Sequence, residues 1–197
     1  MRSLEQLLAA AADFQRILQG HRWRFCFIGG VAIQRWGNPR FTQDMDITLL
    51  TGFGGEEKFI DVLLAELAPR RADAREFALS RRVLLARTRD GVEVDIALGA
   101  LPFEERTINR ASLWEVRKNV TLTTCSAEDL VVHKVFAGRG LDWGDVERIL
   151  IRQHGKLDWK LIRSELKPLL DLKGEPEALA ELEKLAETVE RRLRAKP

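Results

Sequence analysis

The chain has 197 residues, 45% hydrophobic and 31% charged, a composition that favours a soluble globular protein with one good core. A formal net charge of +2 excludes a strongly basic nucleic-acid binder, so any contact with nucleic acid has to come from a local patch. The sequence shows no apolar run near the roughly 20 residues that span a bilayer. It also shows no signal-peptide pattern, and its two cysteines have no disulfide-type or metal-type spacing. We therefore expect a cytoplasmic protein without a membrane segment.

The first 124 residues predict helices and strands in mixed order. An N-cap serine and a following glycine bracket an expected helix over residues 3–19, whose apolar residues recur at helical spacing. Residues 92–98 alternate strictly, with valine, isoleucine and leucine on one strand face and Glu93 and Asp95 on the other. Further helices are expected over 31–36 and 56–67, and further strands over 24–28, 46–50, 83–86 and 119–124.

Nearly every segment after Ser126 has the pattern of a helix. Ser126 opens the first of them with a capping-box-like start. Further helices are expected over 143–152, 159–167 and 176–194, the last with a clear apolar stripe. We therefore predict an α/β (α+β) fold in which residues 1–124 form a small mixed sheet with flanking helices. Residues 125–197 are expected to form a helical lobe that closes a cleft.

Two carboxylates follow a glycine turn at a spacing that puts them on one strand face. An apolar run ends at Gly29 and Gly30, and Asp44 and Asp46 open the next apolar run. Residues two apart on a strand point the same way, so both carboxylates should face the space that the glycines leave open. Two like charges about 4 Å apart repel by roughly 4 kcal/mol at an effective dielectric near 20, so a cation or positive side chains must neutralise them. The pattern predicts a divalent-metal site beside a backbone phosphate cradle.

Asp95 adds a third carboxylate on a neighbouring strand. Asp44, Asp46 and Asp95 together are an oxygen-rich set that can hold two Mg²⁺ ions. Two such ions stabilise both the attacking and the leaving oxygen of an in-line displacement. The alternative is that Asp44 caps a turn and that Asp95 is a solvated strand residue.

The order Gly29-Gly30, thirteen residues, then Asp44-Met45-Asp46 resembles the signature of the DNA polymerase β-like nucleotidyltransferase superfamily. The resemblance implies a small nucleotidyltransferase sheet and an aspartate pair that binds two Mg²⁺ ions. It also implies that Asp95 helps to activate the acceptor hydroxyl.

The segment Arg40-Phe41-Thr42-Gln43 before the aspartate pair is similar to the minimal bacterial branch of that superfamily. The resemblance implies that Arg40 and Thr42 reach the nucleotide, whereas the alternative is a turn that only positions Asp44. The superfamily often has serine where this chain has Gly30. The contacts of the turn with a triphosphate are therefore expected from backbone N–H groups alone.

A second block, residues 129–145, is similar to the AbiEii and MenT-like toxin nucleotidyltransferases. The resemblance implies that Lys134 contacts the nucleotide phosphates, for which a compact point charge is well suited. It also implies that Arg139, Asp142 and Asp145 line the same cleft. The alternatives are that Lys134 is a solvated lysine of an amphipathic helix and that Asp142 is the N-cap of the next helix.

Seven arginines between residues 70 and 89 alternate with acidic residues, a pattern that favours a solvated face. If the acceptor is RNA, this stretch is a place for its backbone, because phosphate contacts position a nucleic acid without reading its sequence.

These observations predict a Mg²⁺-dependent nucleotidyltransferase that moves a nucleoside monophosphate from a nucleoside triphosphate to an acceptor hydroxyl. The expected acceptor is RNA, with tRNA as the first candidate, and the family resemblance implies a toxin with a cognate antitoxin. One alternative is a small-molecule nucleotidyltransferase of the antibiotic-modifying type. Another is a non-catalytic relative that binds nucleotide or a partner protein.

Overall fold

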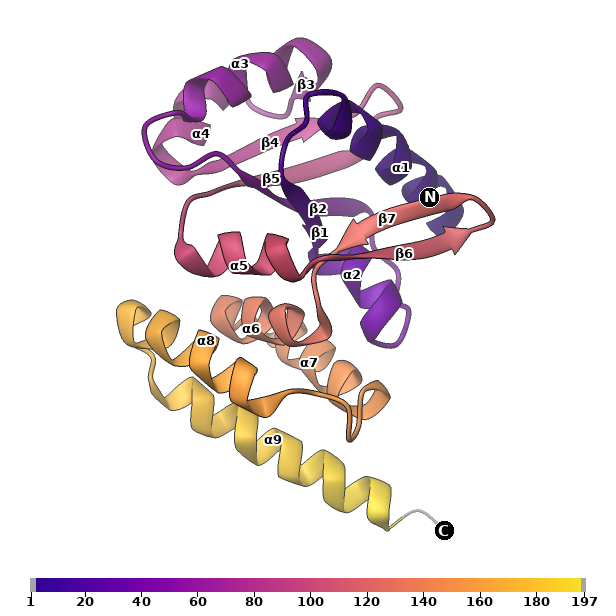
Figure 1. Cartoon of the computed structure of the whole chain (residues 1–197), viewed down its shortest axis with the longest axis vertical. Helices are drawn as coiled ribbons and strands as arrows, with labels where there is room; N and C mark the ends of the chain where they lie inside the picture. Colours follow the sequence, from indigo (N-terminus) through magenta and orange to yellow (C-terminus); the bar gives the residue numbers. More distant parts are fainter. Residues whose placement is uncertain (1–2, 196–197) are drawn as a thin grey trace. The chain divides into compact units, whose positions relative to one another are not determined.

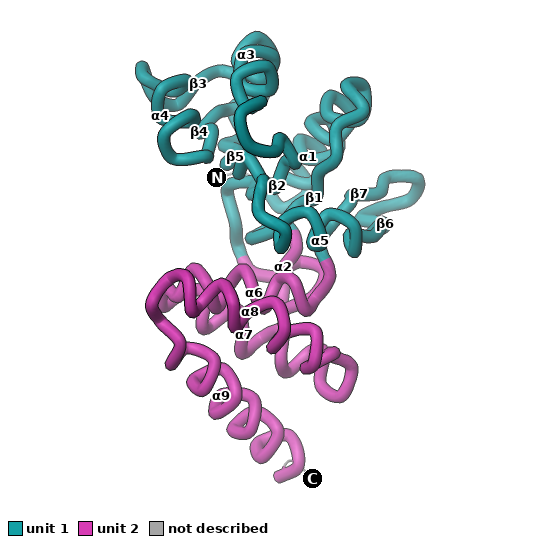
Figure 2. Tube along the Cα trace, turned by 60° about the vertical axis from the view of Figure 1, so that its left-hand side comes forward, with its two compact units in different colours: residues 1–31, 41–125 teal, residues 32–40, 126–197 magenta. Residues whose placement is uncertain are grey.

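The structure, a computed structural model, describes residues 3–195. These residues form two compact units (Figure 2), which we call the sheet unit, residues 3–31 with 41–125, and the helical unit, residues 32–40 with 126–195. The segment 32–40 therefore packs with residues that follow it by almost 90 positions or more. The expected division into domains at residue 124 stays a prediction.

The sheet unit is built on a mixed sheet (Figure 1). Among the described residues its seven strands lie in the order β3-β4-β5-β2-β1-β7-β6. Parallel pairing joins β2 to β5 and β1 to β7, and the other neighbours are antiparallel. The strands are β1 (Phe25–Ile28), β2 (Asp44–Leu50), β3 (Ala68–Pro69), β4 (Val83–Arg87), β5 (Glu93–Gly99), β6 (Ser112–Arg117) and β7 (Val120–Thr124). The mixed α/β fold predicted from the sequence is confirmed.

Helices flank this sheet, and the first of them begins with a capping box. The Ser3 hydroxyl accepts a hydrogen bond from the Gln6 N–H at 3.2 Å, and the Gln6 side chain accepts one from the Ser3 N–H at 2.9 Å. This reciprocal pair satisfies two N–H groups that the helix itself leaves without partners. The helices are α1 (Leu4–Gly20), α3 (Glu56–Glu66), α4 (Ala74–Arg81) and α5 (Pro102–Arg110), together with the start of α2 (Gly29–Trp36).

One face of the sheet packs into the hydrophobic core. Phe27, Ile47 and Ile96, from three neighbouring strands, are fully buried in one cluster with Phe14 of α1 and Ile60 of α3. The next residue along each strand points to the opposite face, because side chains alternate across a strand. The polar positions of β2 and β5 therefore share the face that does not enter this core.

The sequence reading of the sheet unit needs four additions and one correction. Helices α4 and α5 and strands β3 and β6 were not predicted. In α5 only Phe103 and Thr107 are buried, which is too few positions for a periodic apolar signal. Strand β2 begins at Asp44 and not at Asp46, because its parallel ladder with β5 already pairs Asp44 with Glu93.

The helical unit contains four further helices, packed around an apolar centre that includes Leu130, Ile149, Ile162 and Leu182. They are α6 (Ala127–Ala137), α7 (Gly140–Arg152), α8 (Trp159–Lys173) and α9 (Glu177–Arg194). The Ser126 hydroxyl caps α6 by accepting a hydrogen bond from the Asp129 N–H at 3.0 Å. No helix in the described part of the chain is long and apolar enough to cross a membrane.

Side chains from the C-terminal end of α7 and from its C-cap residue hold the segment 32–40 in the helical unit. The Gln153 amide donates a hydrogen bond to the Trp36 carbonyl at 3.0 Å, and Arg152 donates one to the Gly37 carbonyl at 2.5 Å. Within the segment, the Gln34 amide donates to the Arg40 carbonyl at 2.8 Å. These bonds satisfy the backbone carbonyls where α2 ends and the chain turns back towards β2.

Candidate active site

A glycine turn brings the backbone against the first carboxylate of the candidate site. Strand β1 ends at Ile28, which pairs with Asp46 of β2, and α2 begins at once with Gly29 at φ +50°. The Gly30 N–H donates a hydrogen bond to Oδ2 of Asp46 at 3.1 Å. A Cβ atom at position 29 would lie 1.9 Å from the same oxygen, so both the backbone angle and the close approach require glycine there.

Thr42 occupies the space over the second glycine and fixes Asp44. Its hydroxyl donates a hydrogen bond to Oδ1 of Asp44 at 2.9 Å. A Cβ atom at position 30 would lie 2.3 Å from that hydroxyl oxygen. A side chain at position 30 therefore requires Thr42 to move, which gives a physical reason for glycine at this position.

Four carboxylates share the polar face of β2 and β5. The parallel register places Asp44 beside Glu93 and Asp46 beside Asp95, and all four residues are partly buried. Burial raises the pKa of Asp95 above its ordinary value, and the negative charges of Asp44 and Glu93 raise it further, although Arg70 acts against both effects. This face therefore concentrates like charge at one place on the sheet.

Arg70 neutralises part of this charge. Its guanidinium pairs with Oδ1 of Asp95 and, at 3.0 Å, with Oε2 of Glu93. Arg87 of β4 pairs with the other oxygen of Glu93 at 2.7 Å. The sequence reading placed Arg70 in a solvated arginine stretch and so missed this role, because its partners lie 23 and 25 residues further along the chain.

Two of the aspartates suit the expected metal directly. Mg²⁺ usually takes one or two protein carboxylates together with substrate phosphates, and Asp44 and Asp46 supply two carboxylates on one face of β2. Asp95 shares that face but is bound to Arg70. Within residues 3–195 no group of three or more histidine, cysteine, aspartate or glutamate side chains is gathered closely enough to hold a metal ion. The three-carboxylate ligand set stays a prediction.

In the helical unit, Lys134 lies in a buried ionic cluster. Its ammonium group is 2.8 Å from Oδ1 of Asp142 and 2.9 Å from Oδ2 of Asp145, and its side chain is only 8% exposed. The alternative that Lys134 is a solvated lysine is therefore wrong. Burial alone would raise the pKa of Asp142, but hydrogen bonds from Arg139 and Lys134 outweigh it and hold that pKa below its ordinary value.

The alternative that Asp142 is the N-cap of the next helix is also wrong. Helix α7 begins at Gly140, so Asp142 lies inside the first turn, and the residue at the N-cap position is Arg139. The Arg139 guanidinium donates a hydrogen bond to Oδ2 of Asp142 at 2.6 Å. Asp142 therefore acts as the shared acceptor of two cationic side chains.

Arg40 joins the same cluster from the segment that precedes β2. It donates two hydrogen bonds to Asp145, at 2.7 and 2.8 Å, the bidentate geometry that suits a guanidinium and a carboxylate. Arg148 adds a third cation at 3.2 Å from Asp145. Burial by itself would raise the pKa of Asp145, but the hydrogen bonds from Arg40 and Lys134 lower it below the ordinary value.

The residues expected to form one site thus fall into two local groups, one in each unit. The first group lies on the glycine turn, β2 and β5 of the sheet unit and contains Gly29, Gly30, Thr42, Asp44, Asp46 and Asp95. The second lies in the helical unit and contains Arg40, Lys134, Arg139, Asp142 and Asp145. Sequence reasoning found both groups but did not find Arg70 and Glu93 in the first or Arg148 in the second.

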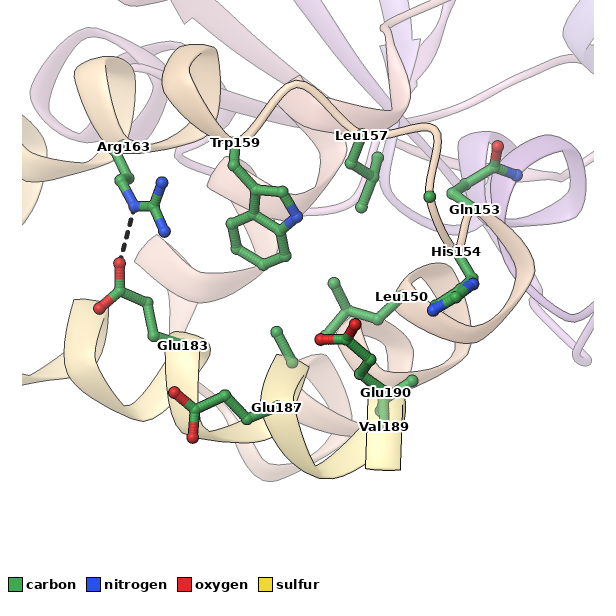
Figure 3. Close-up of a pocket in the computed structure, with 12 residues that line it drawn as sticks. Leu150, Gln153, His154, Leu157, Trp159, Arg163, Glu183, Glu187, Val189 and Glu190 are labelled. Atoms are coloured by element: carbon green, nitrogen blue, oxygen red, sulfur yellow. Dashed lines mark hydrogen bonds and ion pairs between the residues drawn. The ribbon is translucent and has the colours of Figure 1, made fainter. Parts of the chain in front are cut away.

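A separate pocket of about 410 Å³ lies within the helical unit (Figure 3). The Trp159 ring and Leu157 line it from the α7–α8 side, and Glu183, Glu187 and Glu190 line it from α9. Arg163 bridges part of the rim by pairing with Glu183 at 2.7 Å. Neither group of candidate site residues lines this pocket.

Comparison with known proteins finds one family model that matches most of the chain. A family model described as "Nucleotidyl transferase AbiEii toxin, Type IV TA system" matches residues 13–193. Among solved structures, an antigenic nucleotidyltransferase-like protein from Paracoccidioides brasiliensis matches with a TM-score of 0.50 and 12% identity, over 89% of this chain and 94% of that chain. The solution structure of the antibiotic-resistance factor ANT(2'')-Ia matches with a TM-score of 0.45 and 15% identity, over 97% and 95%. No curated protein sequence matches.

Proposed function

The chain belongs to the AbiEii nucleotidyltransferase toxin family and is a nucleotidyltransferase, and we propose that it transfers a nucleoside monophosphate from a nucleoside triphosphate to a hydroxyl of RNA. The observation that carries the proposal is the contact between the glycine turn and the carboxylate pair. Gly30 donates its N–H to Asp46, while Asp44 shares the same strand face. This contact supports a proposal in which the turn binds phosphate and the two carboxylates hold a metal ion side by side.

In this proposal Asp44 and Asp46 hold Mg²⁺ together with the phosphates of the substrate. The ions, when bound, supply positive charge to the attacking and leaving oxygens. The start of α2, where an anion is favoured, would contact the phosphates through backbone N–H groups other than that of Gly30, which donates to Asp46. The family resemblance assigns Lys134 and Arg139 to the triphosphate; this assignment stays a prediction, and in this structure both cations pair with Asp142.

The proposed reaction forms one bond and breaks another at the α-phosphorus. The acceptor hydroxyl oxygen attacks that phosphorus, the bond to the bridging oxygen of the β-phosphate breaks, and pyrophosphate leaves. Asp95 takes the proton of the hydroxyl. Its raised pKa, which burial causes, makes its carboxylate a stronger base than an ordinary aspartate.

The family match includes toxin–antitoxin systems in its description. We therefore propose that the transfer inactivates an RNA of the host cell, with tRNA as the first candidate, and that a cognate antitoxin limits this activity. Such substrates place the reaction in the cytoplasm.

Label transfer tests the proposal directly. Purified protein is incubated with Mg²⁺, each α-labelled nucleoside triphosphate in turn and total cellular RNA, and a D44A/D46A variant serves as the control. Label in RNA with the wild type alone is the expected result, and its size class and the preferred base then identify the acceptor. Label found only in a small-molecule or protein fraction of an extract would show that the acceptor is not RNA. Nucleotide binding without label in any fraction would overturn the proposal.

A further inference from the structure

We propose that Arg70 is a positioning residue that competes with divalent cations for Asp95. The inference rests on the proposed function, because it concerns the same carboxylate face. Three aspartates share a face of β2 and β5 in this structure. A side-chain cation of the protein already holds one of them.

The contacts of Arg70 show how it takes this position. Its backbone N–H donates a hydrogen bond to the Leu85 carbonyl at 3.1 Å, directly after the short strand β3, so its Cα is fixed at the edge of the sheet. From there the guanidinium pairs with Asp95 through one nitrogen and with Glu93 through another. The Arg70 side chain is 23% exposed, and the two carboxylates are 35% and 36% exposed. The pairs are therefore partly shielded from water.

The negative charges of this face favour binding of the Arg70 guanidinium or of a metal ion, but each cation weakens the binding of the other. Asp44, Glu93 and Asp95 are like charges at adjacent positions on one face of β2 and β5, so they repel one another. Arg70 relieves this repulsion with one positive charge. A divalent cation at Asp95 would meet the repulsion of the guanidinium, which already binds Oδ1 of that carboxylate.

Glu93 gives Arg70 a second place to bind. A guanidinium has five N–H donors in a fixed fork, so it can remain on Glu93 when Asp95 is released to a cation. Glu93 also pairs with Arg87 through its other oxygen, so it is held in place on both sides. The geometry thus assigns Asp95 the exchangeable contact and Glu93 the permanent one.

Mn²⁺ binding to the full-length protein tests this competition without relying on turnover. Free Mn²⁺ is measured by electron paramagnetic resonance during titration of the wild type and of the variants R70Q, R70K and R87Q. We expect R70Q to bind Mn²⁺ about five- to tenfold more tightly, because it removes one partly shielded charge pair. R70K keeps the charge but loses the fork, so an intermediate affinity is expected. R87Q is the matched control, because Arg87 pairs with Glu93 and not with Asp95.

The combined variant R70Q/D95N shows whether the effect passes through Asp95. With asparagine at position 95, the R70Q substitution should no longer increase the affinity for Mn²⁺. An R70Q variant that binds Mn²⁺ with wild-type affinity would overturn the role of Arg70, because it would show no competition. An R87Q variant that gains as much affinity as R70Q would also overturn it, because the effect would then be one of general charge. Thermal melting of each variant confirms that the fold is retained.

The failure of this inference can be told apart from failure of the proposed function. If the wild type transfers label and binds Mn²⁺ but R70Q binds it no better, only the Arg70 inference fails. If neither the wild type nor R70Q binds Mn²⁺, the Arg70 inference also fails, and the label-transfer comparison with D44A/D46A decides the function separately.

Discussion

The backbone N–H of Gly30 donates a hydrogen bond to Oδ2 of Asp46 at 3.1 Å, so the start of a helix and the third residue of a strand hold each other in place. The two residues are 16 positions apart, and the contact depends on the antiparallel pairing of Ile28 with Asp46. The orientation of one candidate metal ligand is therefore built into the sheet, and several measurable consequences follow from it.

Replacing Asp46 with asparagine should abolish transfer and leave the fold intact. Asparagine keeps an oxygen that can accept the Gly30 N–H, so the turn is retained, but the negative charge for the metal is lost. We expect kcat/KM to fall at least about a hundredfold and the melting temperature to stay close to that of the wild type. Transfer at the wild-type rate would exclude Asp46 as a metal ligand.

Alanine at position 29 should damage both stability and activity. The methyl group would lie 1.9 Å from Oδ2 of Asp46, and the backbone would keep a left-handed φ of +50°. The left-handed conformation alone costs about 1–2 kcal/mol for a residue with a Cβ atom, and the displaced carboxylate adds a loss of transfer. Urea denaturation measures the change in stability.

G20A is the matched control for G29A. Gly20 ends α1, and a Cβ atom there would meet nothing within 4 Å. The free energy of unfolding should change by less than about 1 kcal/mol, with alanine favoured in a helix over glycine. Equal destabilisation by the two substitutions would show that the close approach of Asp46 is not the cause.

Asparagine in place of Asp145 should destabilise the helical unit strongly. Asp145 is fully buried and is the shared acceptor of Lys134, Arg40 and Arg148, so its neutralisation weakens three ion pairs, of which the one with the 8% exposed Lys134 is buried on both sides. A loss of about 3 kcal/mol is expected from breaking a buried ion pair. R163Q, which breaks the exposed pair with Glu183, should cost less than about 1 kcal/mol. Similar losses for both variants in urea denaturation would contradict the importance of burial.

The same aspartates should make stability depend on acid pH. Asp142 and Asp145 have pKa values held below the ordinary 3.8 by their cationic partners, in spite of burial. The unfolded chain therefore binds protons more readily than the folded protein. The stability that these pairs contribute is present above about pH 4 and is lost as the pH falls through the folded-state pKa values. Urea denaturation between pH 3 and pH 6 should show this slope flattened in D145N.

The pH dependence of transfer should report on Asp95. Because burial raises the pKa of Asp95, kcat/KM should rise with pH through a value above the ordinary 3.8. Arg70 opposes the effect of burial, so R70Q should move this limb of the profile to higher pH. The R87Q substitution removes a guanidinium that does not contact Asp95, so it should leave this limb of the pH profile in place. An unchanged profile in R70Q would argue against Asp95 as the proton acceptor.

Strict alternation in the sequence was sufficient to predict the strand that carries Asp95. Val94 and Ile96 are fully buried, and Glu93 and Asp95 share the opposite face. The i, i+2 spacing likewise placed Asp44 and Asp46 correctly on one face of β2. Both inferences need only the local geometry of a strand.

The ion-pair partners of the site residues could not be predicted from the sequence. Arg70 meets Asp95 only because the two-residue strand β3 pairs with β4, and two residues carry no periodic signal. Arg40 meets Asp145 across 105 positions, which no local pattern encodes. The burial of Lys134 had a weak local sign, since Val131, Val132 and Val135 leave α6 without a wide polar face.

Gly30 and Thr42 compete for one small volume beside Asp44. The volume holds one hydroxyl group, which in this chain comes from position 42, and a Cβ atom at position 30 would overlap it at 2.3 Å. Serine could therefore enter at position 30 only if the Thr42 side chain moved or were replaced. The new hydroxyl would then take over the same neighbourhood from the other side of the turn. The side chains at positions 30 and 42 therefore depend on each other, and a substitution at either position changes which residues the other accepts.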